Sequence, residues 1–285
     1  MCRLFGMSAG SQRVRATFWL LDAPDSLRRQ SHANPDGTGL GTFDEQGRPL
    51  VEKQALAAWD DDAFAMEARQ RCSATFVAHV RHSSGSGVTA ANTHPFEQDG
   101  RLFARNGVVG GLHRLEEHLG PDLRLVSGDT DSERVFALIT RETERAGGDV
   151  SQGISVALGW VDENLPIYAV NLVLTTATDL WALRHPDTHE LWVLERAGGS
   201  GTLDHRSRQG THVVSRELAD APSVVVASER LDDGDGWRLL EPGVLVHVGP
   251  DLVVTEREIL PAPPRHQLTL ADLGAAAPSQ KPTSR

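Results

Sequence analysis

The chain has 285 residues, enough for one large domain with a sizeable core, and its 39% hydrophobic and 24% charged content is typical of a globular protein. With 28 Lys and Arg against 39 Asp and Glu, the formal net charge is −11 and no basic run interrupts it, so we expect no nucleic-acid partner. The N-terminus lacks the apolar segment of a signal peptide, and no stretch resembles a membrane helix, which favours a cytoplasmic protein that binds no membrane.

Strand and helix patterns follow one another in blocks. Residues 75–82 have the β-branched and apolar content of a strand, and residues 101–111 predict a strand that runs into a glycine-rich turn. Residues 129–148 predict the clearest helix, and residues 149–166 predict a second helix that ends at a proline. Seven strand-like segments follow between residues 168 and 258. Blocks of strands with paired helices between them favour two sheets with helices outside over alternating βαβ units.

The end of the chain differs in composition from the rest. Residues 261–285 are rich in Pro and Ala and poor in bulky apolar side chains, so they predict a C-terminal tail with a tendency to disorder. Within it, LTLADL (residues 268–273) is the one part expected to dock. The folded domain is therefore expected to span residues 2–260.

Several familiar catalytic motifs do not fit. Ser86 lies in SSGSG rather than in a GxSxG elbow, and residues 37–43, GTGLGTF, lack the last glycine of a dinucleotide loop. His79 and His82 would face opposite sides of a strand, which makes a poor metal pair. A zinc enzyme is therefore disfavoured, and no metal site is expected.

The position of Cys2, directly after the initiator methionine, suggests a different chemistry. Removal of Met1 would leave a thiol and a free α-amine on one carbon, and such amines titrate at about 7.7–8.0 in model peptides. The amine could therefore serve as the base for the thiol. Asn106 and the N–H of Gly107, just after a predicted strand, could stabilise a tetrahedral oxyanion. The only other cysteine, Cys72, has no role in this scheme.

Charged residues could hold an amino-acid substrate, although each also has a structural explanation. Arg81 fits a structural ion pair, Asn106-Gly107 a hairpin turn, and Asp131 a helix-terminus acid. Their combination with Cys2 favours catalysis, because one Arg and one Asp suit the charged end of a free amino acid.

Six segments together carry a family resemblance: MCRLFGMSA, NPDGTGLGTF, AHVRHSSGSGVTAANTHPF, FARNGVVGG, SGDTDSE and VVVASERL with the following WRLLEPGVLVHV. They resemble class II glutamine amidotransferases of the N-terminal nucleophile (Ntn) hydrolase superfamily over residues 2–260. The nearest branch is that of stand-alone proteins, such as the γ-glutamyl hydrolase of ergothioneine synthesis and a fungal subunit for glutathione breakdown. The resemblance implies an α+β fold, the four-layer αββα sandwich with two stacked, mainly antiparallel sheets and helices outside.

The resemblance also implies roles for individual residues. Cys2 would be the nucleophile with its α-amine as base, and Asn106 and Gly107 would form the oxyanion hole. The implied reaction is cleavage of the γ-amide of glutamine or of a γ-glutamyl conjugate through a Cys2 thioester. It releases glutamate and ammonia or an amine, and needs no metal or organic cofactor.

Substrate-binding residues follow from the same resemblance, with two departures. Arg81 would pair with the α-carboxylate, Asp131 of TDSE would bind the α-ammonium, and His94 of NTHPF would help to shape the pocket. Close relatives usually read HNG where this chain has Arg105 before Asn-Gly, which adds a charge beside the oxyanion hole. They read DGWG where this chain has Thr38, which removes a large aromatic side chain.

Three functions remain open at this level. The first is an amidase that acts on free glutamine and passes ammonia to a separate synthase or acceptor subunit, or on a γ-glutamyl conjugate with no acceptor. The second is a non-catalytic module on the same fold that binds an amino acid for regulation. The third, acylase or peptidase chemistry, would not by itself require both Arg81 and Asp131.

Overall fold

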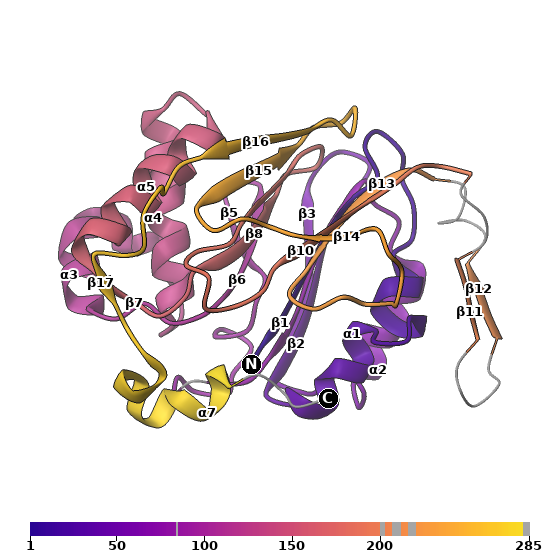
Figure 1. Cartoon of the computed structure of the whole chain (residues 1–285), viewed down its shortest axis with the longest axis horizontal. Helices are drawn as coiled ribbons and strands as arrows, with labels where there is room; N and C mark the ends of the chain where they lie inside the picture. The colour runs from indigo at the N-terminus through magenta and orange to yellow at the C-terminus, as the bar shows by residue number, and fades with distance from the viewer. Residues whose placement is uncertain (84, 200–202, 207–211, 216–220, 282–285) are drawn as a thin grey trace.

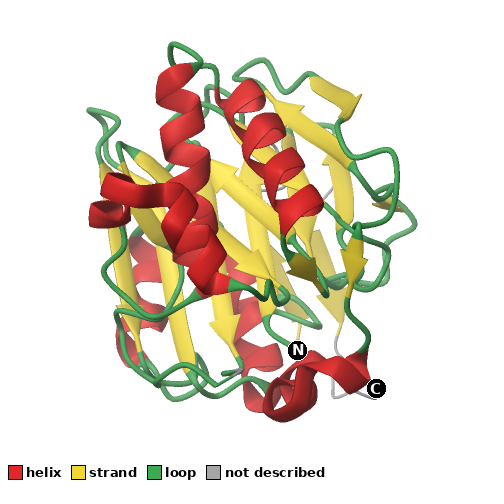
Figure 2. Cartoon of the chain, turned by 90° about the vertical axis from the view of Figure 1, so that its left-hand side faces the viewer, coloured by secondary structure: helices red, strands yellow, loops and turns green. Residues whose placement is uncertain are grey.

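Two antiparallel sheets lie face to face and carry helices on their outer sides, as Figures 1 and 2 show. This is a computed structural model, which describes residues 1–281 apart from residues 84, 200–202, 207–211 and 216–220. The predicted αββα sandwich is confirmed. Part of one predicted strand, residues 211–218, lies outside the described residues.

The first sheet has seven strands and contains the N-terminal strand β1 at its centre. All of its neighbouring strands are antiparallel. In spatial order the strands are β14 (Trp237–Leu239), β10 (Trp192–Arg196), β13 (Ser223–Ala227), β1 (Arg3–Ser8), β4 (Thr75–Arg81), β2 (Gly37–Phe43) and β3 (Pro49–Gln54).

The second sheet has six strands, again antiparallel throughout. In spatial order they are β16 (Val254–Glu258), β15 (Val244–Val248), β9 (Leu180–Leu183), β8 (Asn171–Thr175), β6 (Arg101–Asn106) and β5 (Phe96–Gln98). Two small pairs accompany the main sheets: β11 (Leu203–Arg206) with β12 (His212–Ser215), and β7 (Pro166–Ile167) with β17 (His266–Gln267).

Helices cover the outer face of each sheet. The first sheet is covered by η1 (Phe18–Asp22), α1 (Leu27–Gln30), η2 (Ser31–Ala33) and α2 (Asp62–Gln70). The second is covered by α3 (Leu112–Leu119), η3 (Gly120–Leu125), α4 (Asp131–Arg145) and α5 (Val150–Asn164), which stand in front of the strands in Figure 2. No helix within the described residues is long and apolar enough to cross a membrane.

Side-chain alternation along the strands creates three apolar layers. In β1, Phe5 and Met7 pack with the outer helices, whereas Leu4 belongs to the layer between the two sheets. In β6, Phe103 packs with the outer helices and Ala104 lies between the sheets. The same alternation determines which polar side chains at the strand ends point into the space between the sheets.

The C-terminal segment docks more closely than its composition predicts. β17 pairs in parallel with β7, and η4 (Leu270–Ala276) and α7 (Ala277–Gln280) then run to the N-terminus, as seen at the bottom of Figure 1. Ser279 and Gln280 are each only 2% exposed. The expectation that only residues 268–273 dock was therefore wrong. The contacts of this segment are polar, so hydropathy gave no sign of them.

Candidate active site

Cys2 immediately precedes β1. Side chains alternate between the two faces of a strand, so the Cys2 thiol faces the same side as Leu4, which is the space between the sheets. The backbone of His82, just past the end of β4, contacts the sulfur through both its N–H and its carbonyl. The His82 N–H donates to Sγ at 3.1 Å, and Sγ donates to the His82 carbonyl at 3.2 Å. Met1 is attached and 8% exposed, and its ammonium donates to the Lys281 carbonyl at 3.3 Å. The α-nitrogen of Cys2 therefore lies in a peptide bond.

The thiol and the N-terminal amine both have shifted pKa values. Burial raises the pKa of the Cys2 thiol, and the His82 N–H, the N-terminal charge and nearby arginines oppose this rise only in part. Burial, reinforced by Arg3, lowers the pKa of the Met1 ammonium. Since low polarity disfavours charge on both groups, the thiol is protonated and needs a base to become a nucleophile.

Asn106 ends β6 on the face shared with Ala104, and its side chain reaches across to Cys2. Its Nδ2 donates to the Cys2 carbonyl at 2.9 Å, and the side chain is almost fully buried. Gly107 follows with φ +114°, and a Cβ there would overlap the carbonyl of Ala169. Only glycine fits this left-handed turn. The predicted oxyanion-hole pair therefore lies beside Cys2.

Arg81, at the end of β4, enters the same space but already has partners. It is 4% exposed, and burial lowers its pKa. Its guanidinium donates to the Gly87 carbonyl at 3.1 Å and to Ser86 Oγ at 2.7 Å. Asp36 holds the start of the same loop by accepting from the Ser83 N–H at 2.8 Å. A substrate carboxylate would share this guanidinium with the loop.

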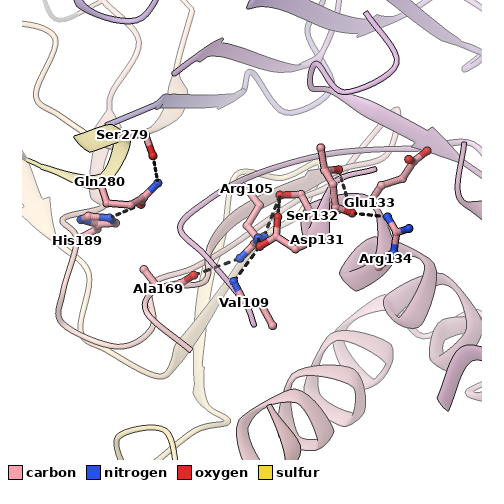
Figure 3. Close-up of polar contacts among 11 residues, drawn as sticks. Arg105, Val109, Asp131, Ser132, Glu133, Arg134, Ala169, His189, Ser279 and Gln280 are labelled. Carbon is pink, nitrogen blue, oxygen red and sulfur yellow. Dashed lines mark hydrogen bonds and ion pairs between the residues drawn. The ribbon is translucent and has the colours of Figure 1, made fainter. Parts of the chain in front are cut away.

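Asp131, at the start of α4, forms an ion pair with Arg105 that Figure 3 shows at its centre. The Asp131 carboxylate also accepts from the Val109 N–H at 2.8 Å, while Arg105 donates to Ser132 Oγ and to the Ala169 carbonyl, each at 3.2 Å. The expectation that Arg105 adds a charge beside the oxyanion hole is corrected, because alternation along β6 turns its side chain away from Asn106 and toward α4.

His94 lies behind the oxyanion-hole residues. Its ring lies tilted against that of His79, with 4.3 Å between centroids, and edge-on to that of Phe96, with 4.7 Å between centroids, and it is 5% exposed. Burial, together with neighbouring cations, lowers its pKa well below the ordinary value. Its place fits packing behind the pocket rather than contact with Cys2.

A cavity of about 500 Å³ opens beside the N-terminus. The Arg230 guanidinium lies over the Trp192 ring, 5.4 Å from its centroid. Nearby, His189 Nε2 lies 3.0 Å from Gln280 Oε1 of the C-terminal segment, at the left of Figure 3. The residues that line the cavity include Met1, Arg184, Thr188, His189, Trp192 and Arg230.

The sequence matches the family described as class-II glutamine amidotransferases over residues 1–265, which is most of the chain. The chain belongs to this family. Among curated relatives of this amidotransferase, the γ-glutamyl-hercynylcysteine sulfoxide hydrolase of Mycobacterium tuberculosis is 31% identical over 247 residues, covering 83% of this chain and 88% of the relative. A probable glutamine amidotransferase of Saccharomyces cerevisiae is 28% identical over 171 residues, covering 52% of this chain and 47% of the relative.

Solved structures share the fold. A glutamine aminotransferase class-II domain protein from Silicibacter pomeroyi superposes with a TM-score of 0.61 at 21% identity, covering 91% of this chain and all of that one. Glutamine phosphoribosylpyrophosphate amidotransferase from B. subtilis gives a TM-score of 0.64 at 18% identity, covering 92% of this chain and 50% of that one. The Ntn assignment of the fold is thereby confirmed.

Two residues beside Cys2 were not predicted as part of the candidate site. His82 supplies the backbone contacts to the thiol, and His79 contacts Asn106 at 3.1 Å. The position of His79 could have been predicted, because it lies two residues before Arg81 in the same strand and its side chain therefore faces the same side. Thr38, the other departure, is buried and donates to the Leu56 carbonyl at 2.8 Å. Within the described residues, no group of three or more His, Cys, Asp or Glu side chains could hold a metal ion.

Proposed function

We propose that this amidotransferase hydrolyses γ-glutamyl amides through a thioester on Cys2, after Met1 has been removed. The observation that carries the proposal is the position of Asn106, whose amide lies 2.9 Å from the Cys2 carbonyl while the thiol lies against the His82 backbone. These contacts support a site in which the Cys2 thiol is the nucleophile, Asn106 is an oxyanion donor, and the α-amine left by removal of Met1 is the base.

In the first half of the reaction, the Cys2 α-amine accepts the thiol proton as Sγ attacks the amide carbonyl carbon. The carbonyl oxygen becomes an oxyanion, which Asn106 Nδ2 and the Gly107 N–H stabilise. The C–N bond then breaks, and the ammonium returns its proton to the leaving nitrogen. The products are a γ-glutamyl thioester and an amine.

In the second half, water attacks the thioester carbonyl while the Cys2 α-amine accepts one of its protons. The C–S bond breaks, the thiol is restored and glutamate leaves. The burial that lowers the pKa of the Met1 ammonium supports this role, because burial of a new amine at the same end of the chain would favour its neutral, proton-accepting form in the same way.

The cavity beside Met1 supports a conjugate rather than free glutamine as the substrate. Because the α-amine returns a proton to the leaving nitrogen, the leaving group must lie beside the Cys2 nitrogen, where Met1 now stands. A space of about 500 Å³ on that side suits an amine much larger than ammonia. The cavity carries both signs of charge, because Arg184 and Arg230 line it together with Asp187, Glu190 and Glu229, and this suits a leaving group that itself has charged groups, such as an amino acid.

The Mycobacterium tuberculosis relative, by its name, also hydrolyses a γ-glutamyl conjugate. If glutamine were the true substrate instead, the ammonia would pass to a separate synthase subunit. These alternatives differ in the released amine. We expect kcat/KM for a γ-glutamyl amino acid to exceed that for glutamine by about tenfold or more. Equal or higher values for glutamine would favour the synthase-linked alternative.

An amino-acid sensor is the second candidate, because both charged groups assigned to the substrate already have protein partners. Arg81 donates to Ser86 and Gly87, and Asp131 pairs with Arg105. Calorimetry that finds glutamine binding, without turnover of any γ-glutamyl amide, would favour the sensor.

The deciding experiment is the intact mass of purified protein before and after treatment with an electrophilic glutamine analogue. We expect a mass without Met1 and one adduct, blocked by excess glutamine. Cys2→Ala should lose both the adduct and the hydrolysis, whereas Cys72→Ala, the matched control at the only other cysteine, should keep both. Undiminished hydrolysis by Cys2→Ala would overturn the mechanism.

A further inference from the structure

His79 lies between the two sheets, directly behind the candidate oxyanion hole. It belongs to β4, where its backbone pairs with Leu4 on one side and Gly39 on the other, and it is 0% exposed. Its Nε2 lies 3.1 Å from Oδ1 of Asn106. A buried imidazole thus contacts the one side chain that also touches the nucleophile residue.

The two contacts of Asn106 determine which way its amide points. The Cys2 carbonyl can only accept a hydrogen bond, so the group that faces it at 2.9 Å is the NH₂ end. The oxygen end therefore faces His79, and Nε2 of His79 carries the hydrogen that it donates to Oδ1. One of the two Nδ2 hydrogens is used by the Cys2 carbonyl, and the other is free to meet an oxyanion.

The charge state of His79 is consistent with this assignment. Burial lowers its pKa to about 3, so the ring is neutral at physiological pH and has a single N–H. Its Nε2 makes the hydrogen bond to Asn106, and this contact selects the tautomer. A fixed neutral donor adds no charge beside the reacting carbonyl and leaves the negative charge of the intermediate to Asn106 and Gly107.

We propose that His79 is a positioning residue that holds the Asn106 amide with its nitrogen directed at the reacting carbonyl. This inference rests on the proposed hydrolase function. Without the His79 donor, Oδ1 is a buried acceptor with no partner, and the amide can turn to find one. The Nδ2 hydrogen of Asn106 that would donate to the oxyanion then no longer points at it. The loss appears in the transition state, where the negative charge develops, rather than in substrate binding.

Three variants of the Met1-free protein test this role, with γ-glutamyl-p-nitroanilide as the substrate. His79→Leu removes the donor, and His79→Gln restores an N–H at similar reach. His185→Leu removes another buried imidazole, which contacts Asp162 of α5 rather than Asn106, and serves as the matched control. The rate of Cys2 alkylation by iodoacetamide is measured in each variant to report on the thiol itself.

We expect His79→Leu to lower kcat by about 30- to 100-fold with KM changed less than about threefold, which is below the full loss of an oxyanion donor. His79→Gln should recover most of this loss, and His185→Leu should stay within about threefold of the wild type. Alkylation of Cys2 should not change. The proposal is overturned if His79→Leu keeps its kcat, if His185→Leu loses as much, or if alkylation falls in parallel with kcat.

The tautomer of His79 provides a test that needs neither a folded His79→Leu protein nor activity. ¹⁵N chemical shifts of the ring should show a protonated Nε2 and an unprotonated Nδ1. The opposite tautomer would overturn the proposal. A wild-type protein that hydrolyses no γ-glutamyl amide would contradict the proposed function instead, and would leave the tautomer result to decide how Asn106 is held.

Discussion

Arg105 brings a full positive charge into the interior of the protein. Its side chain is 0% exposed, and its guanidinium pairs with Asp131 and donates to Ser132 and Ala169. An Arg this deeply buried is stable only because each of these acceptors is in place. The pair therefore links β6 to α4.

Removal of this guanidinium should cost much more stability than removal of an exposed one. We expect Arg105→Leu to lower the free energy of unfolding by about 3 kcal/mol, because it leaves Asp131 without its cation. Arg48→Leu is the control: Arg48 pairs with Asp44 but its side chain is 74% exposed, so the loss should stay below about 1 kcal/mol. Urea unfolding measures both variants, and equal losses would mean that the buried pair contributes nothing special.

Elements with strong local signals were predictable. The helix predicted over residues 129–148 is α4, and Thr130 caps its start by accepting from the Glu133 N–H at 3.2 Å. β4 and β6 followed from their apolar and β-branched residues. β2 was not recognised, because GTGLGTF is rich in glycine, which is rare in strands. It forms a strand because it pairs with β3 and β4. Glycine is needed at position 39 because a Cβ there would overlap the His94 carbonyl and lie 2.9 Å from Pro95 Cδ.

The packing of α4 on α5 depends on one glycine. A Cβ at Gly153 of α5 would overlap Thr143 Oγ1 and lie 2.7 Å from the Thr143 Cα, whereas one at Gly159 of the same helix would meet nothing within 4 Å. Gly153→Ala must therefore push the helices apart, and we expect it to lower the free energy of unfolding by about 2–3 kcal/mol. The alternative, that helix propensity dominates at both positions, predicts a gain instead.

Gly159→Ala separates these effects within one helix. It removes the entropic disadvantage of glycine without a steric cost, so the free energy of unfolding should rise by about 0.5–1 kcal/mol. Opposite signs for the two variants in urea unfolding would support close packing at Gly153. If both variants gained stability, the close approach of Thr143 to α5 would be contradicted.

At the scale of the whole molecule, the site is assembled from residues that are distant in sequence. Cys2, His82 and Asn106 come from three segments on both sheets. A strand pattern predicts alternation but not which strands face one another, so contacts such as His79 to Asn106 could not be predicted from the sequence. The C-terminal contacts could not be predicted for a related reason. Gln280 and Ser279 are polar side chains that are buried against a surface formed by the entire fold.

Buried neutral histidines make the stability of the whole molecule depend on pH. Burial lowers the pKa of His79 to about 3 and lowers that of His94 well below its ordinary value. Above pH 6.5 both rings are neutral whether the chain is folded or unfolded, so they cause no pH dependence there. Below pH 6.5 the unfolded chain binds protons that the folded protein excludes, and stability falls as the pH approaches the folded pKa.

His79 alone should lower the free energy of unfolding by about 2 kcal/mol between pH 8 and pH 5, and His94 should add to this loss. Urea unfolding at the two pH values measures the loss. His94→Phe keeps a buried ring but removes one titrating group, so part of the loss should disappear. His113→Gln changes a side chain that is 85% exposed and is the control, with the loss unchanged. If His94→Phe lost as much stability as the wild type, the acid sensitivity would originate in other groups.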